Sequence, residues 1–143
     1  MNLHGKEIAA NCFEKCQNLK YISIPSFITS IGEKAFSFCT NLKQLIFEDH
    51  SSLTLICKSA FEGCFSLNEI SIPSSVTTIE HGIFKGCKLL EKISFENPSS
   101  LTIMPKCAFY QCTSLNQVII PSSVNLIKNY TFCECSSLKE VII

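Results

Sequence analysis

The sequence lacks most of the features that mark an enzyme. It contains one aspartate, Asp49, and three histidines that stand apart from other candidate catalytic side chains. Its five glycines are scattered, so that no glycine-rich phosphate loop forms, and no Gly-x-Ser-x-Gly sequence occurs. We therefore predict a protein without catalytic residues and without a cofactor.

The sequence also has no excess of charge of one sign and no long apolar run. Lysine and arginine together number 12, as do aspartate and glutamate, so the basic footprint of a nucleic-acid-binding protein is missing. No apolar stretch approaches the ~18 residues of a membrane span, and no basic segment followed by an apolar one marks an export signal near the amino terminus. These absences predict a soluble chain that binds neither nucleic acid nor membrane.

What the sequence does contain is a repeat with three landmarks. A phenylalanine recurs at intervals of 23, 25, 23, 25 and 23 residues, a cysteine follows it by three residues, and a leucine follows the cysteine by three. The phenylalanines are Phe13, Phe36, Phe61, Phe84, Phe109 and Phe132; the cysteines are Cys16, Cys39, Cys64, Cys87, Cys112 and Cys135. Six copies in step identify a repeat protein, in which stacked units bury a common core.

Each unit predicts two extended segments and one compact one. Two apolar residues, such as Ile70 and Ile72, follow the leucine with the alternation of a β-strand, and a proline or an enlarged corner ends it. A second apolar pair, such as Val76 and Ile79, indicates a short second strand. The stretch 32–39 has helical spacing and is too short for more than a turn or two. We therefore predict an α/β solenoid of six coils over residues 1–143, with a parallel β-sheet on one face and helical or 3-10 turns on the other.

The unit Ile-Pro-Ser-Ser-Val-Thr-x-Ile, followed by Ala-Phe-x-x-Cys-x-x-Leu-x-x-Ile, resembles the BspA-like class of leucine-rich repeats over nearly the whole chain. This class is abundant among surface proteins of anaerobic bacteria and of parasitic protists. The resemblance implies a surface antigen that mediates cell adhesion by binding host proteins or cells, at the cell surface or outside the cell.

The ten cysteines have two possible roles. The six landmark cysteines are expected to fill a column in the core as small buried thiols, with a disulfide framework as the rival interpretation. Cys12, Cys57, Cys107 and Cys133 lie near the compact segment and are the expected exposed thiols. No Cys-x-x-Cys pair occurs, and His4, His50 and His81 occupy unrelated repeat positions, so we predict no metal site.

The candidate binding surface consists of the strand residues that point away from the core. By register they form two columns. The first column holds Tyr21, Gln44, Glu69, Lys92, Gln117 and Glu140, and the second includes Ile46, Ile119 and Ile142. The first column varies while the landmarks do not, and the isoleucines are apolar where solvent is expected. Partner binding and neutral drift on a solvated face explain this variation equally well.

Two functional hypotheses follow. The first is a protein-binding module of the surface-adhesin kind, and the alternative is a cytoplasmic scaffold of the same fold, which the missing export signal and the ten cysteines favour. The chain begins almost inside a repeat and ends within the strand motif at Ile143. We therefore also expect either a fragment of a longer array or end-to-end self-association.

Overall fold

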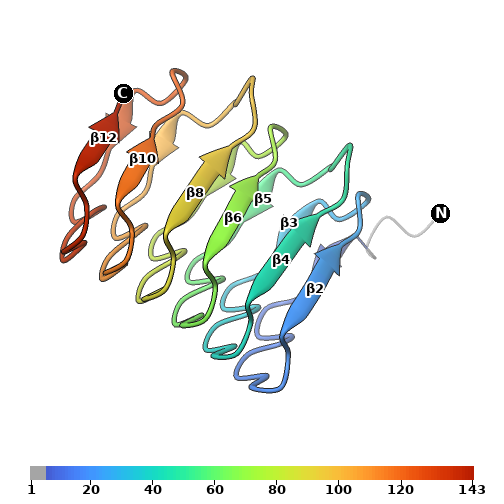
Figure 1. Ribbon diagram of the computed structural model, residues 1–143. Helices are drawn as coiled ribbons and strands as arrows, with labels where there is room; N and C mark the ends of the chain where they lie inside the picture. Colours follow the sequence, from blue (N-terminus) through green and yellow to red (C-terminus); the bar gives the residue numbers. More distant parts are fainter. Residues whose placement is uncertain (1–5) are drawn as a thin grey trace.

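The computed structural model describes residues 6–143 as a right-to-left stack of six coils (Figure 1). Each coil contributes one longer strand to the face that Figure 1 turns toward the viewer. These strands are β2 (Tyr21–Ile24), β4 (Gln44–Phe47), β6 (Glu69–Ile72), β8 (Lys92–Phe95), β10 (Gln117–Ile119) and β12 (Glu140–Ile142). We call this surface the strand face. The predicted single domain over 1–143 includes residues outside the described range and stays a prediction.

All strand pairs are parallel, as expected when successive coils wind in the same direction. Tyr21 pairs with Gln44, Glu69 with Lys92, and Gln117 with both Lys92 and Glu140. The repeat therefore places equivalent residues side by side. The predicted parallel β-solenoid of about six turns is confirmed.

A second set of two-residue strands lies behind the strand face. It consists of β1 (Glu7–Ile8), β3 (Ser30–Ile31), β5 (Leu55–Ile56), β7 (Thr78–Ile79), β9 (Ile103–Met104) and β11 (Leu126–Ile127). β1, β3, β5 and β7 form one parallel sheet, and β9 and β11 form another. These are the short extended segments that the second apolar pair of each repeat predicts.

The prediction of helical or 3-10 turns is wrong, because residues 6–143 contain no helix of either kind. Each compact segment instead places two left-handed residues four positions apart, such as Lys34 and Phe38, both with φ of 55°. Left-handed residues interrupt a right-handed helix. Alternate amides bond to the next coil, as where Phe36 N donates to Ala60 O over 2.8 Å. The amides between them bond within their own coil, as where Ser37 N donates to Lys34 O over 3.1 Å. The compact segment is therefore a series of turns, and every second amide joins two coils.

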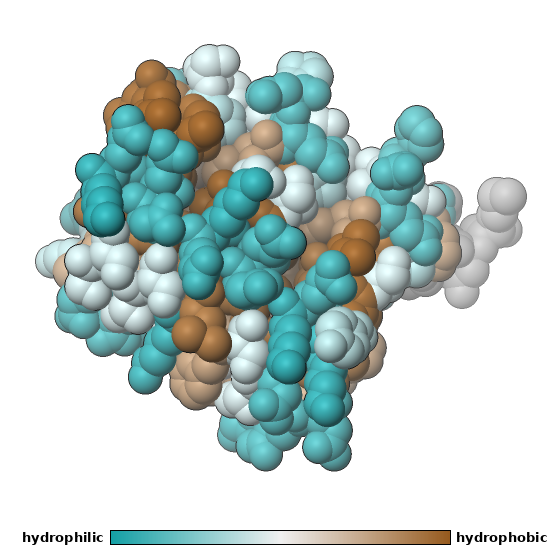
Figure 2. Space-filling model, viewed as in Figure 1, coloured by the Kyte–Doolittle hydropathy of each residue, from teal (hydrophilic) through white to brown (hydrophobic). Residues whose placement is uncertain are grey.

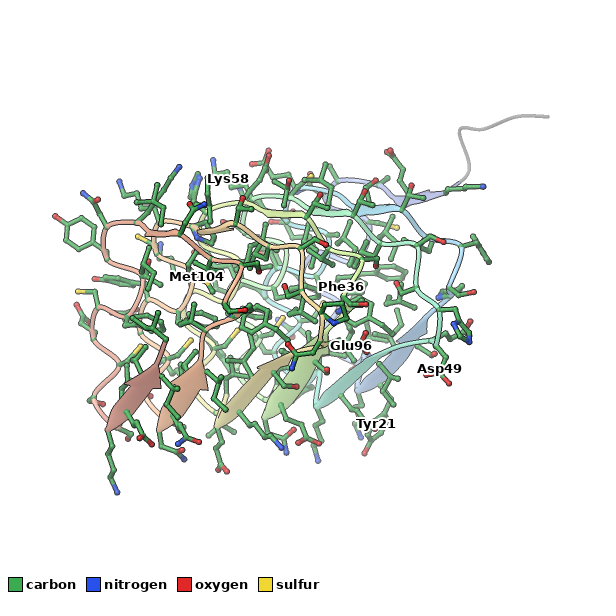
Figure 3. All side chains as sticks on the ribbon, turned by 90° about the horizontal axis from the view of Figure 1, so that it is seen from above. Tyr21, Phe36, Asp49, Lys58, Glu96 and Met104 are labelled. Atoms are coloured by element: carbon green, nitrogen blue, oxygen red, sulfur yellow. The ribbon has the colours of Figure 1, made fainter. Side chains whose placement is uncertain are left out.

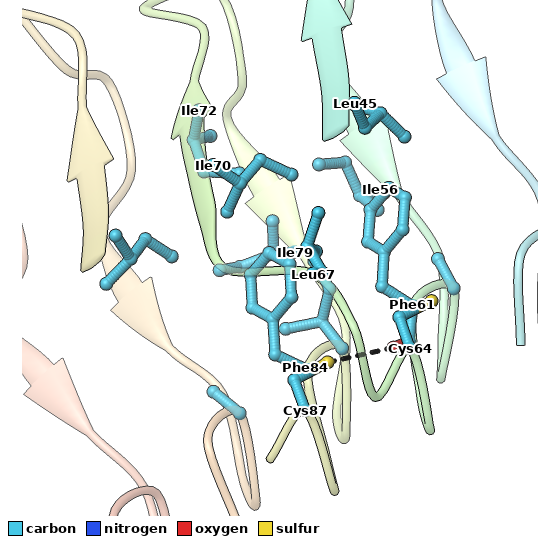
Figure 4. Close-up of a cluster of buried hydrophobic side chains, with 14 of the residues drawn as sticks. Leu45, Ile56, Phe61, Cys64, Leu67, Ile70, Ile72, Ile79, Phe84 and Cys87 are labelled. Atoms are coloured by element: carbon cyan, nitrogen blue, oxygen red, sulfur yellow. Dashed lines mark hydrogen bonds between the residues drawn. The ribbon is translucent and has the colours of Figure 1, made fainter. Parts of the chain in front are cut away.

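The core consists of the landmark columns. The six phenylalanine rings stack with centroids 5.1 to 5.7 Å apart and ring planes within 12° of parallel. Phe36, Phe61, Phe84 and Phe109 are fully buried. Figure 4 shows Phe61 and Phe84 packed among apolar side chains from both sets of strands. Stacked burial of this kind is the main source of stability in a solenoid, because one coil cannot cover its own apolar face.

The predicted column of buried cysteines is confirmed at the four central positions, and the cysteines at the two ends are less deeply buried. Cys39, Cys64, Cys87 and Cys112 are fully buried, whereas Cys16 and Cys135 in the two outermost coils are half-buried. All ten cysteines are free thiols. Of the four expected exposed thiols, Cys12 is exposed, but Cys57, Cys107 and Cys133 are half-buried against neighbouring turns.

Candidate functional site

The strand face carries all nine residues named for the two outward columns, and each of them is exposed. Seen from above, Tyr21 projects outward from this face, while Phe36 and Met104 lie inside the solenoid and Lys58 lies on the opposite side (Figure 3). The alternation of the strands causes this separation, because every second side chain points away from the core. The nine residues therefore share one surface.

Apolar and polar side chains mix on the strand face. Ile46 is 50% exposed and Ile119 is 58% exposed, and Ile119 lies beside the exposed Ile142 in the register of β10 and β12. Figure 2 shows hydrophilic residues across the middle of this face with hydrophobic residues between them. A surface of this composition can bury apolar side chains of a partner and surround them with polar contacts.

The strand face is interrupted between β4 and β6. β2 and β4 pair over four residues, as do β6 and β8, but β4 and β6 are not hydrogen-bonded neighbours. The interruption follows the first enlarged corner, residues 47–53. It opens a groove of about 240 Å³ whose lining includes Gln44, Ile46, Glu69, Lys92 and Glu96. Four of these five residues belong to the predicted set.

A second groove lies between β8 and β10, after the second enlarged corner. These strands pair at only two positions, Lys92 with Gln117 and Ile93 with Val118. A groove of about 280 Å³ opens beyond them, and its lining includes Lys92, Gln117 and Ile119. The first enlarged corner thus separates the β2–β4 sheet from the four-stranded sheet of β6, β8, β10 and β12, and the second only shortens the pairing of β8 with β10.

The sequence analysis missed the corner glutamates. The carboxylate of Glu96 accepts a hydrogen bond from Ser74 N over 3.1 Å, and Glu48 accepts one from Ser26 N over the same distance. Each glutamate thus ties an enlarged corner to the short corner of the preceding coil. Their equivalent places in the two long repeats were the signal that could have identified them.

Comparison with known proteins identifies the repeat. A family model described as the BspA type leucine rich repeat region matches six copies over residues 6–139. The chain belongs to the BspA-type leucine-rich repeat family. The predicted resemblance is confirmed, and no curated protein matches the chain.

Solved structures of bacterial leucine-rich repeat proteins resemble this BspA-type chain. A leucine-rich repeat protein of T. pallidum has a TM-score of 0.89 and 32% identity, over 95% of this chain and 62% of that one. The pneumococcal vaccine antigen PcpA has a TM-score of 0.78 and 31% identity, over 85% of this chain and 30% of that one. A leucine-rich cell surface protein of Faecalibacterium prausnitzii has a TM-score of 0.68 and 26% identity, over 95% of this chain and 42% of that one. The BspA-type chain thus spans less than two thirds of each of these proteins.

The buried cysteines of this BspA-type chain are poor candidates for metal binding or nucleophilic chemistry. Burial raises the pKa of Cys39 and of Cys135 to about 11, and it raises the pKa of Cys64, Cys87 and Cys112 further. The thiolate is the form that binds metals and attacks electrophiles, and these thiols stay protonated at neutral pH. Their contribution is to the stability of the fold.

The histidines and acidic residues of the described chain do not assemble into a site. No group of three or more histidine, cysteine, aspartate or glutamate side chains within residues 6–143 is placed to hold a metal ion. Asp49 and His50 are exposed in the first enlarged corner, and His4 lies outside the described residues. Within the same range, no helix has the length and apolar character that a membrane crossing requires. Folds of the leucine-rich repeat class generally serve protein interaction.

Proposed function

We propose that this chain is a non-enzymatic, protein-binding module that holds its partner on the strand face. The observation that carries the proposal is the groove between β4 and β6, where the exposed Ile46 lies among Gln44, Glu69 and Lys92. An apolar side chain surrounded by charged and amide groups is the usual composition of a protein-binding surface, with an apolar centre and a polar rim.

We further propose that the module belongs to a surface protein that adheres to host proteins or cells. Two similar structures support this location, since one is described as a vaccine antigen and another as a cell surface protein. The experiment is a binding assay of the purified chain against a panel of purified host matrix and cell-surface proteins. Specific, saturable binding to at least one of them is the expected result. A uniform absence of binding across the panel would count against adhesion.

The binding site is tested with charge reversals in the groove. We expect Glu69→Lys and Lys92→Glu each to weaken the complex about tenfold. Each substitution replaces an attraction to an oppositely charged group of the partner with a repulsion between like charges. Glu7→Lys is the matched control, since Glu7 is exposed in β1 behind the strand face. Equal affinities for the three variants would exclude the strand face as the binding surface.

The alternative is a cytoplasmic scaffold of the same fold. The ten free thiols favour it, because a reducing compartment keeps cysteines in this state. Protease treatment of intact cells distinguishes the two: a surface protein is cleaved, and a cytoplasmic one is protected. End-to-end association of two copies also stays a prediction, and light scattering across a range of concentrations tests it.

A further inference from the structure

The face opposite the strand face is interrupted at a single proline. In four coils, the residue after the short strand donates its N–H to the preceding coil; Glu80 N, for example, bonds to Ile56 O over 2.9 Å, and Lys128 N bonds to Met104 O over 3.0 Å. Pro105 occupies the same position and has no N–H to donate. β7 and β9, the strands on either side of this missing bond, are not hydrogen-bonded neighbours.

The interruption opens a hollow that is lined mainly by cationic and hydroxyl-bearing side chains. The hollow has a volume of about 600 Å³, and its lining includes Lys58, Lys106, Lys128, His81 and the threonines Thr77, Thr78 and Thr102. A second hollow of about 620 Å³ shares Lys58, His81 and Lys106 with the first, and Lys34 and Lys85 also line it. The two hollows therefore form one continuous concave surface, which we call the lysine face.

The acidic groups of the lysine face are already engaged. The carboxylate of Glu80 accepts the backbone N–H of Lys58 over 2.8 Å, and the carboxylate of Glu62 forms an ion pair with Lys85 over 3.3 Å. Among residues 6–143, neither Lys106 nor Lys128 has an acidic partner within ion-pairing distance. Lys58 also forms an ion pair with Glu33 over 3.7 Å. The five lysines that line the two hollows still outnumber the three carboxylates of Glu33, Glu62 and Glu80, so the lysine face carries an excess of positive charge.

The chain as a whole is neutral, so the excess of positive charge on this face arises because folding brings the lysines together. The strand face carries Glu69, Glu96 and Glu140 against Lys92, while five of the twelve lysines line the lysine face on the opposite side. A hollow surface lined by one sign of charge concentrates the field and attracts ions of the other sign. The composition of the chain conceals this property.

We propose that the lysine face binds an acidic polysaccharide through its sulfate or carboxylate groups. Lysine ammonium groups recognise anions as point charges, and the threonine hydroxyls can donate to and accept from sugar hydroxyls. Successive coils lie roughly 4.8 Å apart. Lys58, Lys106 and Lys128 come from three different coils and line one hollow, so their charges are spread along the solenoid, as the charges of a linear polymer are.

Other anionic polymers fit this surface less well. A single-stranded nucleic acid requires a series of aromatic side chains on which its bases stack. Tyr130 lies at this edge of the molecule, where the Lys106 amine already sits 6.0 Å from its ring centroid. An acidic protein segment would be expected to insert an apolar or aromatic anchor into a pocket. Of the apolar residues in this hollow, Ile79 and Pro105 are buried, and Ile103, which is 38% exposed, is the one apolar side chain of the lining that such an anchor could contact. Binding of a polysaccharide requires neither an aromatic stacking surface nor an apolar anchor.

The test is the affinity of the whole chain for a sulfated octasaccharide, measured by calorimetry near physiological salt and at higher salt. We expect saturable binding that weakens as salt rises, and at least a tenfold loss of affinity in the double variant Lys106→Gln and Lys128→Gln. The matched control is Lys20→Gln with Lys139→Gln, which removes two exposed lysines adjoining β2 and β12 and should bind like the wild type. The charge-conserving double variant Lys106→Arg and Lys128→Arg should retain binding.

Several results would overturn the proposal. They are the absence of binding near physiological salt, equal affinity in the two glutamine double variants, and loss of binding in the arginine variant. Equal affinity for the desulfated octasaccharide would show that charge is not recognised. Equal affinity for a poly-glutamate peptide of matched charge, or for a single-stranded oligonucleotide, would replace the polysaccharide with another polyanion. The site is separate from the strand face, so Glu69→Lys should leave octasaccharide binding unchanged.

Discussion

The thiol of Cys87 donates a hydrogen bond to the backbone carbonyl oxygen of Phe61 in the preceding coil, with Sγ and O 3.1 Å apart (Figure 4). The same bond recurs between the other landmark cysteines from Cys39 onward and the preceding phenylalanine, over 3.0 to 3.1 Å. The cysteine is therefore more than a small apolar filler. It links its own coil to the phenylalanine column of the preceding coil.

Replacing Cys87 with alanine should destabilise the solenoid by about 1–3 kcal/mol, because the change leaves a small cavity and removes a donor from a buried carbonyl. The free energy of unfolding in urea measures the effect. Cys12→Ala is the control, since Cys12 is exposed, and it should change stability by less than about 0.5 kcal/mol. Equal losses in the two variants would mean that the buried column has no special role.

Stability should fall as pH rises above about 9. The ordinary pKa of 9.0 for a cysteine applies to the unfolded chain, whereas burial raises the pKa of Cys39 to about 11 in the folded chain. Below pH 9 both states hold the proton, and stability does not depend on this group. Between about 9 and 11 the unfolded chain releases the proton and the folded chain keeps it. The free energy of unfolding therefore drops, by at most about 1.4 kcal/mol per pH unit for each such thiol.

Urea unfolding at pH 8, 9 and 10 measures this decline. Lysine and tyrosine also titrate in alkali, so the comparison is with Cys39→Ala. This variant lacks one of the thiols whose pKa is raised by burial. Its stability should fall less steeply with pH than that of the wild type. Parallel curves would indicate that Cys39 is not protected from ionisation in the folded chain.

Gly32 should not tolerate a side chain. A Cβ at this position would lie 2.5 Å from the backbone N of Ala10 in the first coil, and only displacement of that coil could relieve the overlap. We expect Gly32→Ala to cost at least about 2 kcal/mol in the free energy of unfolding.

Gly86→Ala provides the comparison for Gly32→Ala. Gly86 has a φ of +72° and no atom closer than 4.0 Å to the added Cβ, so this change adds backbone strain of about 1 kcal/mol without a collision. A loss for Gly32→Ala no greater than that for Gly86→Ala would show that the first two coils do not approach so closely.

The sequence was sufficient to predict the parts of the fold that repeat. Phe61, Cys64 and Leu67 recur because burial selects the same side chain in every coil, and this selection appears as spacing along the chain. The outward columns followed from strand alternation, which is also a local property. The placement of Tyr21 and Glu69 on one face could therefore be derived without coordinates, although their role in binding stays a proposal.

Only the tertiary structure decided how neighbouring coils join. The stretch around Phe36 and Phe38 has helical spacing, but its amides bond to Ala60 and Glu62 in the next coil, and no local pattern carries that information. The interruption between β4 and β6, the gap at Pro105 and the gathering of Lys106 with Lys128 likewise depend on which coils meet. Sequence spacing determined what each coil buries, because burial acts on each residue separately. The grooves and the charge of each face arise between coils, and so they required the fold.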